Sequence, residues 1–312
     1  MMISEMNFET YNGVLLDSRE ATVLRAIEEL SHEKIPFVHQ IPLHDSGCVV
    51  INHHVTEISL FWSNIEQLPQ NFGDLSKLQS LILIACGLKT LPESFSCLEC
   101  LQYIDLSENQ LTRLPDFWGH FSYLHHLDLQ MNSLETLPPS IGQLHSLTKL
   151  FVGANALAGL DFSFKGLQNL EIIDAGSNKI RTLSPDFDHL SNLTHLDLQY
   201  NLLSKIPIKG GQFPWLKYLD LQENNLSFIP PLAASNTLHD LKLGKNHLYT
   251  LDGIADFYPT LEVLDLHGNQ LKDLGGFPSK LPKIRTIFLQ ENRFERLQGL
   301  PLDLPSIETI NI

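Results

Sequence analysis

Apolar residues recur along this chain with a period of 23 residues, in eleven copies that run from Val55 to Ser306. The copy LHHLDLQMNSLETLPPSIGQLHS begins at Leu124, with aliphatic residues at its first, fourth and sixth positions and Asn132 at its ninth. An aliphatic residue opens every copy, and the eighth copy is one residue short, so that Leu238 follows Leu216. A fixed period of this length predicts a solenoid of stacked repeats.

Each repeat is expected to contain one short strand and one turn. Apolar residues alternate in the segment LxxLxL, which predicts a strand with one face inward and the other free. One such strand cannot bury its apolar face alone, so we expect a parallel, concave sheet of about twelve short strands and an irregular or short-helical convex side. The Asn amide after each strand should bond to backbone groups of its own and the neighbouring turn. Nine repeats carry this residue: Asn109, Asn132, Asn155, Asn178, Asn201, Asn224, Asn246, Asn269 and Asn292.

The first 54 residues do not follow the period. Asp17 with Glu20 predicts a capping box, and the apolar stripe behind it predicts a helix that stops near His32. The segment GCVVINHHVTEISL predicts a hairpin whose second strand is the first repeat strand. We therefore expect an N-terminal cap over residues 1–54, eleven repeats over 55–306, and the truncated strand of a twelfth repeat over 307–312. A separate enzymatic N-terminal domain would have too small a core.

Several segments resemble a known repeat family. LPQNFGDLSKL, LPESFSCLECL and LPPSIGQLHSL resemble the intracellular "typical" class of leucine-rich repeat (LRR) proteins, which includes the Ras-group-related ones. The last three repeats more closely resemble the LRR class of phosphatase-1 regulatory subunits. The helix-plus-hairpin cap is similar to caps of some prokaryotic LRR proteins, with archaeal ones among the candidates. The resemblance implies an α/β leucine-rich repeat solenoid, or horseshoe, that binds a protein or peptide on its concave strand surface.

Composition narrows the class of partner. The 312 residues carry a formal net charge of −15 with a pI near 5.3, which disfavours nucleic acid and anionic membranes because both need clustered Lys and Arg. No apolar stretch approaches the ~20 residues that span a bilayer, and the start MMISEMNFETYNG lacks a signal-peptide pattern. Four cysteines do not make a disulfide framework. We expect a cytoplasmic protein.

The ligand should contact the non-consensus strand positions, where acids outnumber bases. Position five carries a recurring Asp, and strands ~4.8 Å apart would place Asp174, Asp197 and Asp220 in one row, where like charges raise one another's pKa. Two readings stay open: the Asp belongs to the LDL pattern of the repeat itself, or the acidic field selects a basic partner. The predicted partner-binding residues are Phe61, Trp62, Tyr103, Asp128, His126, Phe151, Asp174, Asp197, His195, Tyr200, Tyr218, Asp220 and Phe288.

Aromatic side chains interrupt the acidic surface. Tyr103, Tyr200 and Tyr218 are assigned to strand positions, and Tyr is enriched at binding hot spots; Phe151 and Phe288 replace the position-five Asp. An apolar patch on the first two strands is either covered by the cap or used to bind. This patch contains Phe61, Trp62, Ile82, Ile84 and Ala85.

No catalytic or metal-binding constellation is visible in the sequence. Cys97 and Cys100 form a lone CxxC, and burial of Cys97 as a small hydrophobe is the favoured reading. His126 and His195 share a column three repeats apart, too far to hold one metal. We expect no enzyme activity, no metal and no cofactor. The alternative to a general interaction module is a regulator or effector-type binder of a small GTPase or a protein phosphatase.

The sequence IETINI supplies three inward residues of a last strand, Ile307, Ile310 and Ile312. A bare strand edge at this end would be an aggregation hazard. Three explanations stay open: a fragment of a longer protein, loops that fold back as a cap, or an end-to-end homodimer through this strand.

Overall fold

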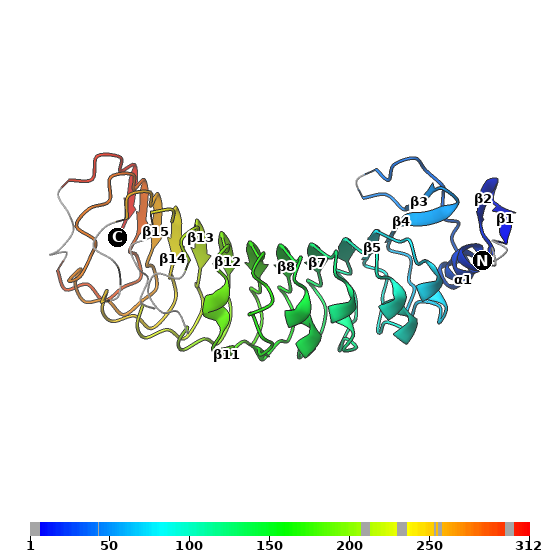
Figure 1. Cartoon of the computed structure of the whole chain (residues 1–312). Helices are drawn as coiled ribbons and strands as arrows, with labels where there is room; N and C mark the ends of the chain where they lie inside the picture. The colour runs from blue at the N-terminus through cyan, green and yellow to red at the C-terminus, as the bar shows by residue number, and fades with distance from the viewer. Residues whose placement is uncertain are drawn as a thin grey trace. The chain divides into compact units, whose positions relative to one another are not determined.

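The structure is a computed structural model that describes residues 7–42, 44–206, 213–229, 236–252, 254, 258–296 and 303–312. It divides into two compact units, residues 1–147 and 148–312. Each unit is a run of stacked repeats, and the fold is a parallel β solenoid with little helix (Figure 1). The predicted fold class is confirmed.

The first unit begins with a small hairpin and one helix. Strands β1 (Phe8–Tyr11) and β2 (Val14–Asp17) pair antiparallel around Asn12 and Gly13, which both have positive φ. The sequence prediction missed this hairpin, although Asn-Gly between two short apolar runs is a hairpin signal. Helix α1 (Ser18–Ser31) follows; the Asp17 side chain accepts a hydrogen bond from the Arg19 N–H, and His32 ends the helix in the left-handed conformation. The predicted helix is confirmed.

Glu20 does not complete the predicted capping box. Its Oε2 accepts a 2.6 Å hydrogen bond from the Val55 N–H, and its Oε1 lies 2.8 Å from Nδ1 of His54. The Asp17 N–H, which a capping-box Glu would bind, donates instead to the His53 carbonyl. Glu20 therefore joins helix α1 to the sheet. Burial at 1% exposure raises its pKa above the ordinary value.

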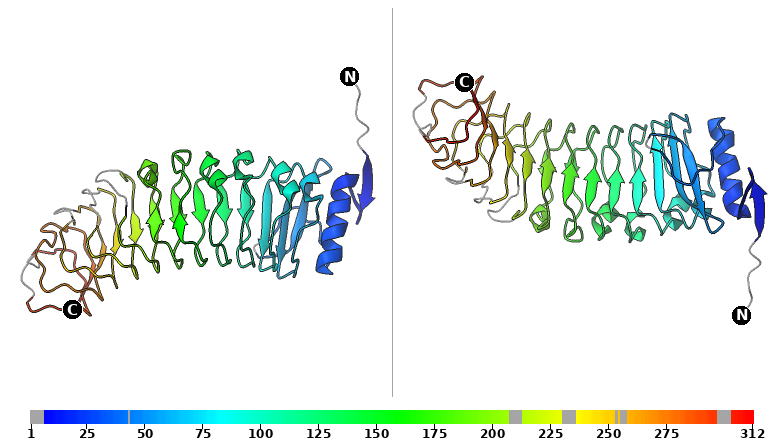
Figure 2. Two further views of the ribbon diagram at one scale, coloured as in Figure 1. Left: turned by 90° about the horizontal axis from the view of Figure 1, so that it is seen from below. Right: turned by 90° about the horizontal axis from the view of Figure 1, so that it is seen from above.

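The predicted second hairpin is confirmed and leads into the sheet of the first unit. Strands β3 (Gly47–Ile51) and β4 (His54–Phe61) pair antiparallel, with Asn52 and His53 both at positive φ in the turn. Parallel pairing continues from β4 to β5 (Ser80–Ile84), β6 (Tyr103–Asp105) and β7 (His126–Asp128). Figure 2 shows these strands side by side, with α1 beside the first of them. The outer turns are short 3-10 helices, as expected: η1 (Phe72–Asp74), η2 (Glu93–Cys97), η3 (Trp118–His120) and η4 (Pro139–Gln143).

The second unit repeats the same arrangement. Its parallel sheet contains β8 (Lys149–Phe151), β10 (Ile172–Asp174), β12 (His195–Asp197), β13 (Tyr218–Asp220), β14 (Asp240–Lys242), β15 (Val263–Asp265), β16 (Thr286–Phe288) and β17 (Thr309–Asn311). A short pair, β9 (Gly159–Leu160) and β11 (Thr182–Leu183), and the helix η5 (Phe187–His189) lie in the connections. The predicted last strand is confirmed, because Ile310 pairs with Ile287.

The Asn side chains bond as predicted. Nδ2 of Asn224 donates to the carbonyls of Leu221 and of Leu198 in the preceding repeat, and its Oδ1 accepts from the Leu203 N–H at 3.0 Å. Such bonds satisfy buried backbone groups that water cannot reach. The same pattern recurs at Asn109, Asn132, Asn178, Asn201, Asn246, Asn269 and Asn292.

The residue before each of these turn positions has left-handed backbone geometry, which the sequence reading did not anticipate. The sequence predicts a strand position for Tyr200, whereas it lies three residues beyond the end of β12 with a φ of 52°. A non-glycine residue rarely adopts this conformation. The hydrogen bond from the Tyr200 N–H to the Gln222 carbonyl holds it in place. The other members are Trp62, Ala85, Glu108, Met131, Ala154, Ser177, Glu223, Lys245, Gly268 and Glu291.

Candidate functional site

The solvent-facing side of the sheet in the second unit carries the predicted acidic row. The register pairs Asp174 with Asp197 and Asp197 with Asp220 across adjacent strands, so the predicted neighbourhood is confirmed. Lys242 and then Asp265 occupy the equivalent register positions on the next two strands. Phe151 and Phe288 lie in register at the two ends of this row, both half-buried.

Each Asp of this row also has a local structural role. Oδ1 accepts a hydrogen bond from the N–H two residues later, at 3.1 Å for Asp174, 3.0 Å for Asp197 and 3.1 Å for Asp220. Asp265 makes the same bond, as do Asp105 and Asp128 in the first unit. A side chain that stabilises the turn after a strand explains part of the LDL pattern without any ligand.

Asp220 forms an ion pair with Lys242, which the sequence did not predict. It is 1% exposed, and its Oδ2 accepts a hydrogen bond from the Tyr218 hydroxyl at 2.9 Å. Nζ of Lys242 lies 3.3 Å from the same oxygen, donates to the Tyr218 hydroxyl at 3.0 Å and stands 4.8 Å from the centre of its ring. Tyr218 is therefore a member of a partly buried polar cluster, and burial raises its pKa to about 12.

Asp197 retains the acidic character of the row. Burial raises its pKa to about 6; the neighbouring carboxylates of Asp220 and Asp174 add to this rise, while the hydrogen bond from the Gln199 N–H and the charge of Lys242 oppose it. The predicted mutual repulsion is present, although burial is the larger cause. A cation placed near Asp197 would replace like-charge repulsion with attraction.

The aromatic residues of the second unit lie in different environments. His195 is exposed and stacks on Tyr218 with ring centres 6.1 Å apart. Tyr200 is 52% exposed in its left-handed turn. The structure therefore places His195 and Tyr218 together, and it places Tyr200 outside the strand.

In the first unit, Tyr103 and His126 form a close stack. Their ring centres are 4.1 Å apart and their planes differ by 14°. Asp105 and Asp128 pair in register on the same two strands. Burial raises the Tyr103 pKa to about 12, with the two carboxylates adding to the shift.

Part of the predicted apolar patch of the first unit is half-buried, and part of it is exposed. Phe61, Ile82 and Ile84 are half-buried, and Phe61 meets the ring of His44 edge-on at 6.0 Å. Trp62 is 73% exposed in a left-handed turn. The cap therefore borders the patch without covering Trp62.

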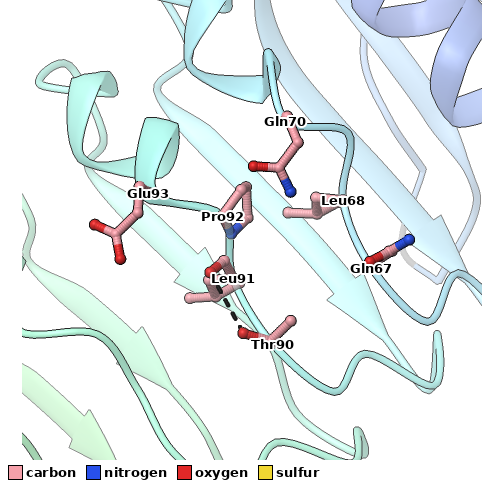
Figure 3. A pocket seen from close by; sticks show the side chains of 7 residues that line it. All are labelled: Gln67, Leu68, Gln70, Thr90, Leu91, Pro92 and Glu93. Atoms are coloured by element: carbon pink, nitrogen blue, oxygen red, sulfur yellow. Dashed lines mark hydrogen bonds between the residues drawn. The ribbon is translucent and has the colours of Figure 1, made fainter.

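The described residues also bear on the predictions for metal ligands and cysteines, and some of them line a small pocket. Among the described residues, no group of three or more His, Cys, Asp or Glu side chains is placed to hold a metal ion. Cys97 is exposed, so its predicted burial is wrong: it lies at the end of η2, on the outer turn. This pocket of about 220 Å³ lies between the first two repeats. Figure 3 shows the side chains that line it, Gln67, Leu68, Gln70, Thr90, Leu91, Pro92 and Glu93. Within the described residues, no helix is both long and apolar enough to cross a bilayer.

Comparison with known proteins points to one repeat family. The model described as leucine rich repeat matches residues 101–157 and 161–203, the two-copy leucine rich repeats model matches 259–302, and a single-repeat model matches 215–236. No functionally curated protein matches the chain by sequence.

Three solved structures illustrate the range of similar proteins. An LRR protein of Leptospira interrogans is 27% identical over 74% of this chain and 71% of its own, with a TM-score of 0.52. FLRT2, solved in a complex with Latrophilin 3 and Unc5D, is 21% identical over 88% and 86% of the two chains, with a TM-score of 0.65. TLR13, in complex with ssRNA13, is 26% identical over 88% of this chain and 40% of that chain, with a TM-score of 0.62.

Proposed function

This chain is a leucine-rich repeat protein, and from that premise we propose that it is a non-enzymatic module that binds a basic protein or peptide on the solvent-facing side of its sheets. The observation that carries the proposal is Asp197. Its pKa of about 6 reflects burial between two further carboxylates, so binding of a Lys or Arg side chain there would stabilise the charged form.

The surroundings of Asp197 suit such a ligand. His195 is exposed on the same strand and stacks on Tyr218, which gives an aromatic surface beside the acids. Aromatic rings next to carboxylates attract Lys and Arg through both the ring face and the charge. Regulation of a GTPase or a phosphatase stays a prediction, as does a cytoplasmic location.

A labelled octalysine peptide tests the charge preference, with octaglutamate as its opposite. We expect octalysine alone to bind, and the affinity to fall as salt rises through physiological strength, where the screening length is about 8 Å. A single-stranded RNA oligonucleotide is the third probe, because TLR13 was solved with an RNA. Tighter binding of RNA than of octalysine would contradict the proposal.

The site is tested with Asp174→Asn/Asp197→Asn. Asn keeps an Oδ1 that can accept the bonds from the Gly176 and Gln199 N–H groups, so charge is removed with little change in structure. The control is Asp252→Asn/Asp273→Asn, a pair of exposed acids of the same unit outside the strands. We expect the first variant to weaken octalysine binding several-fold more than the second; equal losses would place the binding elsewhere.

Pairing of two copies through β17 also stays a prediction. Ile310 is half-buried and Ile312 is 61% exposed. Light scattering of the wild type and of Ile310→Lys at tens of micromolar tests it, since only an interface through β17 would be lost in the variant.

A further inference from the structure

A pocket of about 410 Å³ opens on the solvent-facing side of the sheet in the first unit. Its floor is formed by side chains of three adjacent strands, Phe61 of β4, Ile82 and Ile84 of β5, and Tyr103 of β6. Its wall is formed by the segment between α1 and β3, through Gln40, Ile41, Pro42 and His44. In Figure 1 this segment extends above strand β5.

The wall of the pocket is fixed to the sheet by hydrogen bonds. The Ser59 hydroxyl donates to the Asp45 carbonyl at 3.0 Å, and the Phe61 N–H donates to the Ser46 hydroxyl at 3.1 Å. The Asp45 N–H donates to the Pro42 carbonyl at 3.2 Å, closing a turn. These bonds, together with the contact between the His44 and Phe61 rings, give a largely pre-formed pocket, as ligand pockets usually are.

The pocket is lined by two carboxyl side chains and by the uncharged polar groups of Gln40, Ser59 and Tyr103. Glu57 and Asp105 line it, and Asp128 lies in register beside Asp105 on the next strand. Of the described residues that line the pocket, none is Lys or Arg. The Tyr103 hydroxyl stays protonated at neutral pH because its pKa is about 12. An apolar floor with acidic borders is complementary to a large apolar group that carries a positive charge next to it.

We propose that this pocket binds one large apolar side chain of a partner peptide, flanked in the peptide by Lys or Arg. The apolar side chain would rest on Phe61, Ile82 and Ile84, while the basic neighbours would face Glu57 and Asp105. Anchoring of a large side chain in a pocket surrounded by polar groups is the usual arrangement of an interface hot spot. This inference rests on the proposed function and adds to it a second feature of the partner, a specific apolar anchor.

Three labelled peptides test the proposal by fluorescence polarisation. They are acetylated and amidated, and they differ only in the centre: Gly-Ser-Arg-Phe-Arg-Ser-Gly, the same peptide with Ala for Phe, and the same peptide with Glu for both Arg. We expect the Arg-Phe-Arg peptide to bind the whole chain at least about tenfold more tightly than either of the others. Equal binding of the Phe and Ala peptides would overturn the anchor, and equal binding of the Arg and Glu peptides would overturn the basic flank.

The pocket is located with Ile82→Thr/Ile84→Thr, which keeps β-branched side chains on β5. The matched control is Ile172→Thr, a half-buried Ile on strand β10 of the other unit. The preference for Phe over Ala should vanish in the first variant and persist in the second. Persistence in both variants, or loss in both, would overturn the assignment to this pocket.

A second measurement needs no variant. Amide NMR signals of Phe61, Ile82 and Ile84 should shift when the Arg-Phe-Arg peptide is added to the wild type, and unchanged signals would overturn the proposal. Failure of the proposed function looks different: Asp174→Asn/Asp197→Asn would leave octalysine binding unchanged, whatever the peptides do at the pocket.

Discussion

The side-chain oxygen of Asn109 accepts a hydrogen bond of 3.1 Å from the backbone N–H of Cys86, one repeat earlier in the chain. The same oxygen accepts from the Leu88 N–H at 3.0 Å, while Nδ2 donates to the Leu83 and Leu106 carbonyls. Cys86 holds the equivalent place in its own repeat, where its thiol lies 3.4 Å from the Leu60 and Ile84 carbonyls. Burial raises the thiol pKa to about 11, so it keeps the proton that it donates.

Replacing Asn109 with Ala should lower the free energy of unfolding by at least about 2 kcal/mol, because several buried backbone groups lose their partner at ~1–3 kcal/mol each. Asn109→Cys should cost less, because a thiol can still donate as that of Cys86 does. Hydrogen exchange at the Cys86 and Leu88 amides is the direct measurement. Gln110→Ala, at an exposed neighbouring position, is the control. If the exchange rates of these two amides rose equally in Asn109→Ala and Gln110→Ala, the role given to Asn109 would be contradicted.

A core substitution tests the repeat register. Leu198 is fully buried in the second unit, and Leu198→Ala should cost about 2–5 kcal/mol through lost contacts and a cavity. Ser191→Ala, at an exposed position of the same unit, should change stability by less than about 0.5 kcal/mol. Thr194, in the same repeat as Leu198, is half-buried and its hydroxyl donates to the Glu171 carbonyl, so it is a poor control. Urea denaturation that ranks Ser191→Ala as the costlier change would refute the register.

The repeat period predicted the parts of this fold that depend on identical positions. The strands, the inward leucines and the Asn bonds could be predicted because the same residue types recur at the same positions in successive repeats. Tyr200 illustrates what the pattern left out: alternation suggests that it extends the strand, whereas the Asn201 amide binds the Leu198 and Gln199 carbonyls and turns the chain there. This turn is a consequence of side-chain bonding, which apolar periodicity does not record.

The candidate site was only partly predictable for a related reason. The neighbourhood of Asp174, Asp197 and Asp220 follows from the period, but the ion pair and hydrogen bond of Asp220 depend on Lys242 and Tyr218, which come from two different repeats. The pocket beside Phe61 depends on the non-repetitive segment around His44. No periodicity places that segment over the sheet.

The attachment of the cap to the first repeat can be tested at Glu20. Glu20→Ala removes the acceptor of the buried Val55 N–H, and the unpaired group should cost about 1–3 kcal/mol. Because repeats unfold locally, the loss should appear as faster hydrogen exchange in α1 and at Val55, with little change in the second unit. Glu29→Ala, at an exposed position of the same helix, is the control. Uniformly faster exchange through both units would contradict a local role for Glu20.

Stability should depend on pH through Asp197. Its pKa is raised from the ordinary value of 3.8 to about 6 in the folded protein, so the folded state holds the proton more tightly than the unfolded chain. The resulting stabilisation is fully present below about pH 4, and it is lost as the pH rises through 6.

Asp197→Asn removes this dependence and keeps an oxygen for the Gln199 N–H. At pH 7 the variant should therefore be more stable than the wild type by about 1–2 kcal/mol, the full effect being reduced by solvent screening. Chemical denaturation between pH 4 and 8 measures the difference, which should shrink toward pH 4. Asp273→Asn, at an exposed loop position, is the control for a general effect of charge. A stability difference between Asp197→Asn and the wild type that stayed constant across this range would mean that Asp197 has the pKa of an ordinary carboxylate. That result would contradict the prediction that the acidic row attracts a cation.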